Sequence, residues 1–255
     1  MGRFGKPLCN GGFRRHRGGF APAWAADVVS SNIVGYEKVN LSTKVYKMGG
    51  VQFVNVGGTT ASLNDLFKGD IAYGTEIMFL DDVTGAYVSY KYLAEVYDPD
   101  ADDFVTGWGD VFEELATDPV PNGTGFWFYS DATDGTTVTQ AGEVDGKQTV
   151  SVEVPASQYT MVINPFPQGF NPNDPNVTWT GLEYGTEIMT LSSTGAYVSY
   201  KYLAEVYDPD ADDFVPGWGD VFEELVKDDI VVTGEGFWVL APAKTTITFT
   251  SPVAE

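Results

Sequence analysis

Carboxylates gathered in two short segments are the residues of this 255-residue chain whose spacing could do chemistry. The segments at 95–114 and 205–224 each hold eight acidic residues and no basic residue. Two like charges about 4 to 6 Å apart repel by roughly 3 to 4 kcal/mol at an effective dielectric near 20. Such segments must therefore extend into water or hold a cation. Aspartates at alternate positions supply the hard oxygen ligands that Ca²⁺ prefers. These aspartates are Asp98, Asp100 and Asp102 in the first segment and Asp208, Asp210 and Asp212 in the second.

Two interpretations of these aspartates are open. The first is a calcium site in each segment, although not an EF-hand, because Asp103 stands where that loop needs Gly and Gly109 where it needs Glu. The second is a solvated Asp-rich hairpin loop, since Pro99 and the aspartates are good turn formers. Calcium is the one cofactor that the sequence suggests.

Aromatic residues offer a second kind of site. Trp108 and Trp218 each stand between two glycines, which cannot shield an indole ring. An exposed ring of this kind could stack on a sugar. The alternative is that both rings are core residues, as tryptophans in strands usually are.

Glycoside hydrolysis is the main enzymatic route left open, because it needs only two carboxyl groups, one with a raised pKa in apolar surroundings. Glu76 and Glu187 are the carboxylates with fairly apolar sequence neighbours. One such residue in each half is thin support, so we expect no catalysis.

The overall charge excludes several classes of function. The chain has 36 acidic and 14 basic residues, and from Asp27 onward it contains no arginine, histidine or cysteine. A Ser-His-Asp triad, a Cys-His pair, an ordinary zinc site and an arginine clamp for phosphate are therefore excluded there. The negative charge repels nucleic acid and anionic lipid.

Residues 1–26 are basic and Gly-rich and show no apolar periodicity. Ala23-Trp24-Ala25 resembles a signal-peptidase site, but the apolar stretch that precedes such a site is missing. We interpret this segment as a disordered leader remnant and expect a secreted or cell-surface protein. No apolar run reaches the roughly 20 residues of a membrane helix.

An internal duplication organises the rest of the chain. Residues 84–115 recur at 194–225 with a single change, Thr106 to Pro216. Looser matches extend this identity outward and predict two repeats, at 27–145 and 146–255.

The repeats have the pattern of β structure. Alternate residues of 86–96 are apolar, which is typical of a half-buried strand, and further short strands are expected at 51–56, 125–129, 136–140, 149–154 and 245–250. One helical turn is expected at 62–69. Asp145-Gly146 predicts a hairpin that pairs the last strand of one repeat with the first strand of the next. The fold class is all-β, with two tandem homologous repeats, each a β-sandwich or open barrel, related by a pseudo-twofold axis.

Three short motifs carry a resemblance to a broad group of uncharacterised, secreted bacterial β-repeat proteins. They are the start at 30–36 (SSNIVGY), the turn at 164–167 (NPFP) and the GxGFW strands at 123–127 and 234–238. The resemblance implies export and a surface or matrix setting, but no activity. We therefore expect a non-catalytic structural, adhesive or surface-binding protein whose partners are glycans or other surface proteins, with calcium as its candidate stabilising ion. A carbohydrate-binding module is the second hypothesis, and a carboxylate-based glycoside hydrolase is the third.

Overall fold

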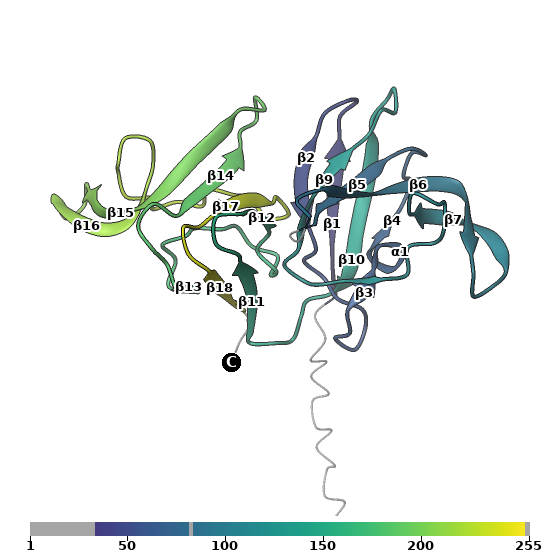
Figure 1. Cartoon of the computed structure of the whole chain (residues 1–255), viewed down its shortest axis with the longest axis horizontal. Coiled ribbons are helices and arrows are strands. Elements are labelled where there is room, and N and C mark those ends of the chain that lie inside the picture. Colours follow the sequence, from purple (N-terminus) through teal and green to yellow (C-terminus); the bar gives the residue numbers. More distant parts are fainter. Residues whose placement is uncertain (1–33, 82–83, 253–255) are drawn as a thin grey trace, which may run out of the picture. The chain divides into compact units, whose positions relative to one another are not determined.

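Antiparallel strands make up most of the molecule (Figure 1). The computed structural model describes residues 34–81 and 84–252, so the leader remnant expected at 1–26 lies outside it. Strand accounts for 52% and helix for 2% of the structure. The all-β prediction is therefore confirmed, and none of the sheets closes into a barrel within the described residues.

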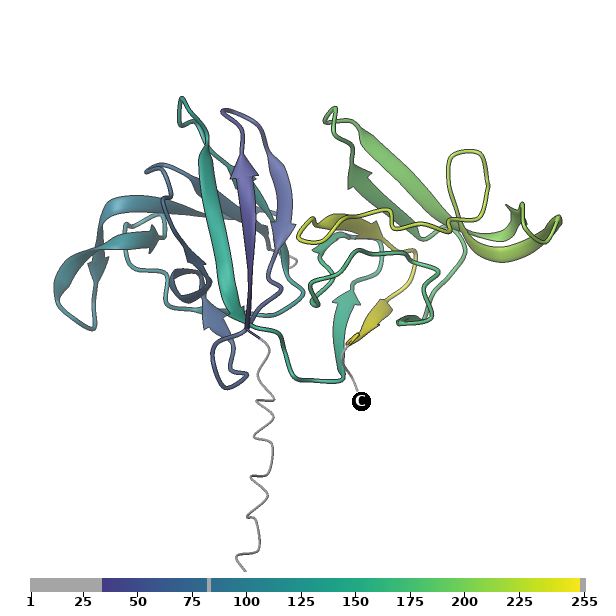
Figure 2. The same ribbon diagram turned by 180° about the vertical axis from the view of Figure 1, so that it is seen from behind.

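The described residues of the first repeat form three sheets. One sheet has five strands, and a three-stranded sheet contains the long pair β1 and β10, which run side by side (Figure 2). The five-stranded sheet has the order β2 (Lys47–Gly50), β9 (Gly125–Tyr129), β5 (Glu76–Leu80), β6 (Tyr87–Asp98) and β7 (Asp103–Gly109). The three-stranded sheet has the order β1 (Val34–Leu41), β10 (Thr136–Glu143) and β4 (Phe67–Lys68), and the third sheet pairs β3 (Ala61–Ser62) with β8 (Pro119–Val120).

The second repeat contains a five-stranded and a three-stranded sheet. The order in the larger one is β12 (Tyr159–Val162), β17 (Phe237–Leu240), β14 (Glu187–Leu191), β15 (Tyr197–Asp208) and β16 (Asp213–Gly219). The smaller one has the order β11 (Thr149–Val154), β18 (Thr245–Thr250) and β13 (Val177–Thr180). The duplicated segment thus forms the same part of both larger sheets, namely the hairpins β6–β7 and β15–β16.

Each repeat has its own apolar core. In the first, Phe53, Trp108 and Phe126 are almost fully buried, and in the second Trp218 and Phe237 are. Full burial of one large apolar side chain contributes roughly 1.5 to 3 kcal/mol. Trp108 of β7 and Trp218 of β16 anchor the two long hairpins in these aromatic cores.

Five of the six strands expected from the sequence are present, and the one expected at 136–140 lies within β10. The strands expected at 125–129, 149–154 and 245–250 are β9, β11 and β18, and the strand expected at 86–96 is β6. The segment 51–56 is not a strand, although Val51 to Val54 are buried. Its backbone hydrogen bonds go to two different parts of the chain. The Val51 N–H donates to the carbonyl oxygen of Thr124, and the Val54 N–H donates to that of Glu143.

The helical turn is confirmed but shorter than expected. It is α1 (Leu63–Leu66), where the Ser62 hydroxyl and the Asp65 carboxylate form a capping box. The turn ends before Gly69 because Phe67 and Lys68 pair with β10 as strand β4.

The Asp145-Gly146 hairpin prediction is wrong. β10 is the central strand of its sheet, so both of its edges are already paired, and β11 pairs with β18 instead. Gly146 does not have the positive φ that a hairpin turn of this type requires. The Asp145 carboxylate is buried and accepts the backbone N–H of Lys147 at 3.1 Å.

The two repeats meet through their backbones instead. Thr124, before β9, forms an antiparallel bridge with Val162 of β12. The buried Gln52 amide donates to the carbonyl oxygens of Asn164 at 2.9 Å and Phe166 at 3.1 Å. The described residues belong to one compact unit. We call this contact the junction.

Two glycine substitutions distinguish what the junction contributes to stability from what the segment connecting the repeats contributes. In Gly125→Ala the new Cβ would lie 2.6 Å from Met161 Cγ, so we expect destabilisation by about 1 to 3 kcal/mol through overpacking. In Gly146→Ala the Cβ meets no atom within 4 Å, so we expect a change below about 0.5 kcal/mol. Urea denaturation measures both, and equal losses would contradict this assignment.

Candidate functional site

The predicted calcium ligands lie in the turns of the two long hairpins. In the first, Asp98 Oδ1 accepts the backbone N–H groups of Asp100 and Ala101 at 3.0 and 3.3 Å. The Asp102 carboxylate accepts the Tyr97 hydroxyl at 2.9 Å, which raises the pKa of Tyr97. Within 34–81 and 84–252, no three acidic side chains are grouped so that they could hold a metal ion. Calcium binding stays a prediction, and the observed contacts are those of a turn.

The second hairpin differs from the first because a lysine side chain contacts its aspartates. Lys227 Nζ lies 2.6 Å from Asp208 Oδ1 and 2.5 Å from Asp210 Oδ2. This contact lowers the pKa of Asp208 and raises the pKa of Lys227. The corresponding residue of the first repeat is Thr117. An ammonium group therefore occupies in one repeat the place that a bound cation would take.

The structure does not support a sugar platform at Trp108 and Trp218. Their exposed fractions are 0% and 1%, so neither ring can meet a ligand. The flanking glycines serve close packing instead of exposing the ring. A Cβ on Gly107 would lie 2.6 Å from Asn64 Oδ1, and one on Gly109 would lie 3.0 Å from Val96 Cγ1.

Each of the two carboxylates considered for hydrolysis contacts a side chain of the neighbouring strand. Glu76 forms an ion pair with Lys91 at 2.7 Å, which raises the pKa of Lys91. Glu187 accepts a hydrogen bond from the Ser199 hydroxyl. Both contacts fit a structural role within β5–β6 and β14–β15.

A tight loop after β7 displays two apolar side chains. The Asp110 carboxylate accepts the N–H groups of Phe112 at 2.8 Å and Glu114 at 3.0 Å, and Tyr97 N–H donates to the Glu113 carbonyl. Glu113 has a φ of 61°, which a non-glycine residue adopts at a cost. The loop is thus held in a defined shape, yet Val111 is 74% and Phe112 80% exposed.

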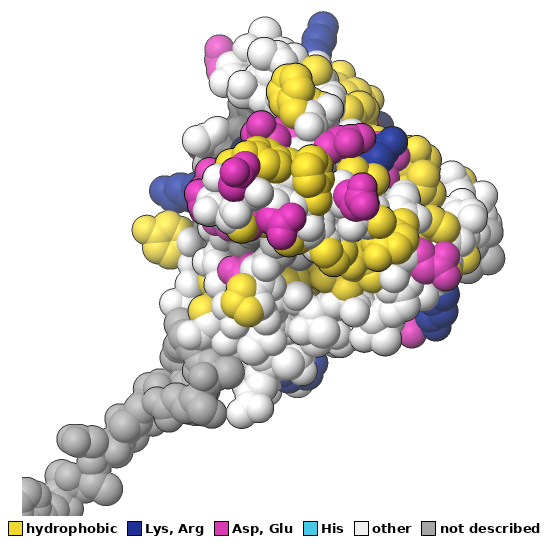
Figure 3. Space-filling model, turned by 90° about the vertical axis from the view of Figure 1, so that its left-hand side faces the viewer, with side chains coloured by type: hydrophobic (Ala, Val, Ile, Leu, Met, Phe, Trp, Pro, Cys, Tyr) yellow, Lys and Arg dark blue, Asp and Glu magenta, His cyan; other side chains and the backbone are white. Residues whose placement is uncertain are grey.

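The second repeat builds the same loop. Asp220 accepts the N–H groups of Phe222 at 2.8 Å and Glu224 at 3.0 Å, and Phe222 is again 80% exposed. Apolar and acidic side chains lie next to one another on the end of the molecule that carries β15 and β16 (Figure 3). We give the name tip surface to the exposed apolar residues that follow each hairpin turn, in the second strand of the hairpin and in the loop after it. The first tip surface comprises Phe104, Val111 and Phe112, and the second comprises Phe214, Val221 and Phe222.

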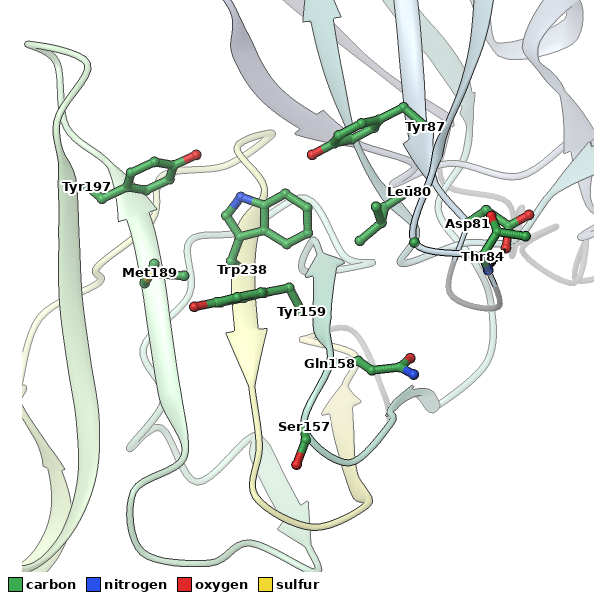
Figure 4. Close-up of a pocket in the computed structure, with 11 residues that line it drawn as sticks. Leu80, Asp81, Thr84, Tyr87, Ser157, Gln158, Tyr159, Met189, Tyr197 and Trp238 are labelled. Atoms are coloured by element: carbon green, nitrogen blue, oxygen red, sulfur yellow. Dashed lines mark hydrogen bonds between the residues drawn. The ribbon is translucent and has the colours of Figure 1, made fainter.

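An aromatic groove of about 740 Å³ lies beside the junction (Figure 4). Tyr159 and Tyr197 line it from the second repeat and Tyr87 from the first, and these three side chains are about half exposed. Trp238 lies between them in the close-up and is 6% exposed. A second hollow of about 590 Å³ shares Tyr87 and Tyr197 with the groove and adds Trp127.

The interpretation of the sequence missed this groove. In the sequence, Tyr46 corresponds to Tyr159 and Trp127 to Trp238, but this correspondence does not show that the two sets line adjoining hollows. In the structure they do, because the two indole rings lie 6.4 Å apart and Trp127 Nε1 donates to the hydroxyl of Tyr87, which lines both hollows, at 3.3 Å.

Comparisons with known proteins gave no match to a family model, to a curated protein or to a solved structure. Among the helices of the described residues, none is long and apolar enough to cross a membrane.

Replacing Lys227 tests the electrostatics of the second hairpin. We expect Lys227→Thr, which restores the residue of the first repeat, to lower the melting temperature slightly at neutral pH. The lowered Asp208 pKa gives stability that is lost as pH falls below the ordinary value of 3.8, and the raised Lys227 pKa gives stability that is lost as pH rises above 10.5. The difference between variant and parent should therefore vanish at both extremes.

The matched control is Lys244→Thr, which removes an exposed pair with Glu153. It should leave the melting temperature nearly unchanged, because exposed pairs contribute little. A Lys227→Thr difference that is constant from pH 3 to 11 would show that the ion pair is not its cause.

Proposed function

We propose that this chain is an exported, acidic protein of two homologous β-sandwich repeats with a non-catalytic adhesive or surface-binding role. In this proposal the two tip surfaces make the contact with a partner protein, outside the cell or on its surface. The exposed phenylalanines on ordered loops carry the proposal.

The loop geometry supports a binding role over a merely solvated turn. A solvated turn has no need for Val111 and Phe112, whose exposure in water is unfavourable. Ordered loops that keep aromatic side chains accessible are typical of contact surfaces, where a few aromatic anchors supply most of the binding energy. Here hydrogen bonds to Asp110 and Tyr97 hold the loop before any partner arrives.

The surrounding charge supports a basic partner. Asp110, Glu113 and Glu114 lie in the same loop as Phe112, and the hairpin turn adds further aspartates. A complementary surface would present lysine or arginine around an apolar pocket, and its approach would be accelerated by the negative field.

The duplication supports two equivalent contacts. Both tip surfaces belong to the segment that is identical at all but one of its positions. Two contacts of equal intrinsic affinity on one chain strengthen attachment to a surface that carries many copies of the partner.

Titration with an amphipathic lysine–leucine peptide tests this proposal. We expect two peptides to bind per chain with one intrinsic Kd, which increases with salt because the charges are exposed. Phe112→Ser should halve the stoichiometry and leave the other site unchanged. The double variant with Phe222→Ser should lose binding without loss of stability, since both side chains are 80% exposed.

Tyr36→Ser is the matched control, because Tyr36 is 72% exposed and lies on β1, away from both hairpins. It should bind two peptides as the parent does. Equal binding of a glutamate–leucine peptide, or undiminished binding by the double variant, would overturn the proposal.

A further inference from the structure

We infer that the aromatic groove binds a neutral polysaccharide chain. The inference concerns a surface separate from the two tip surfaces, and it does not depend on the proposed protein partner. It also differs from a platform at the buried Trp108 and Trp218.

The rings of the groove are available for stacking. Tyr87, Tyr159 and Tyr197 are 51%, 46% and 55% exposed, and all three line the same hollow. The Tyr159 ring packs edge-on against Trp238 at 6.2 Å between centroids, which holds it in place. Half-exposed rings that are held by neighbours present a flat apolar surface, which the C–H face of a pyranose ring can cover while its hydroxyl groups stay hydrated.

The polar groups of the groove suit hydroxyl groups. Ser157, Gln158 and Thr84 line its other side and can donate or accept hydrogen bonds without carrying charge (Figure 4). The remaining polar side chain is Asp81, whose Oδ1 accepts the backbone N–H of Thr84 at 2.9 Å. Sugar hydroxyl groups are the ligand groups that such neutral amides and hydroxyls pair with.

The charge of the groove excludes acidic ligands. Neither lysine nor arginine is among the described residues that line it, and the adjoining second hollow has one lysine, Lys44, among its described lining residues. The whole chain carries a formal charge of −22. A sulfated or uronic-acid polysaccharide, a phosphate ester or a nucleotide would be repelled, whereas a neutral glycan meets no electrostatic penalty.

The duplication favours a ligand that repeats. The two hollows that share Tyr87 and Tyr197 contain corresponding residues from both repeats. These pairs are Tyr46 and Tyr159, Met78 and Met189, Tyr87 and Tyr197, and Trp127 and Trp238. A surface built twice from the same residues fits a polymer whose successive units are chemically the same, and volumes of about 740 and 590 Å³ are ordinary for ligand sites.

Affinity electrophoresis of the full chain tests this inference. Native gels would contain hydroxyethylcellulose, laminarin, arabinoxylan, glucomannan or dextran as neutral polysaccharides, with polygalacturonate and heparin as anionic ones. We expect at least one neutral polysaccharide, and neither anionic one, to retard the protein. Tyr87→Ala and Tyr197→Ala should each weaken that binding about 3- to 10-fold, as the loss of one stacked ring would.

Two further variants keep the result interpretable. Tyr87→Phe retains the ring and should bind within about 2-fold of the parent if stacking is the main contact. Tyr184→Ala removes an equally exposed tyrosine that stacks on Tyr202 outside the groove, and its mobility shift should equal that of the parent. Retardation by none of the neutral polysaccharides overturns the inference. So does binding that survives both groove substitutions, or displacement of the glycan by a proline-rich peptide at lower concentration.

Discussion

Close backbone contact at the junction is the constraint on which the rest of the structure depends. Gly50 and Gly125 make it possible, since a Cβ on either would lie within 3 Å of Ile163 or Met161. The buried Gln52 amide then donates hydrogen bonds to two carbonyl groups of the second repeat, those of Asn164 and Phe166. Because the sheets meet here, Met48, Met161 and Trp238 form a shared apolar cluster.

The junction and the duplication together explain why one chain carries two kinds of surface. Duplicated residues next to the junction, such as Trp127 and Trp238, lie close together, with Trp238 lining the groove and Trp127 the adjoining hollow. Duplicated residues on the long hairpins, such as Phe112 and Phe222, do not meet and remain exposed as two separate tip surfaces. The same duplicated residues thus form one surface to which both repeats contribute, the groove, and two separate surfaces that each belong to one repeat, the tip surfaces.

Local patterns predicted local structure well and long-range contacts poorly. Alternation located β6, and the helical turn expected at 62–69 is present as α1, which the Ser62 and Asp65 side chains cap. Asp145-Gly146 failed as a hairpin signal because the partners of β10 come from β1 and β4, which no neighbouring residue reveals. Trp108 failed as a platform for a related reason. In the sequence, the glycines on both sides of Trp108 suggest that its ring is exposed. In the structure, they allow Asn64 and Val96 to pack closely against the backbone of β7.

Scanning calorimetry of the full chain tests most directly the claim that the junction makes one body of the two repeats. We predict a single unfolding transition in which the calorimetric enthalpy equals the van't Hoff enthalpy, because neither repeat can unfold without exposing the apolar cluster of the junction. Two resolved transitions, each with the enthalpy of half the chain, would contradict it. The groove would then be a gap between independent domains, and its assignment as a binding site would fail with the junction.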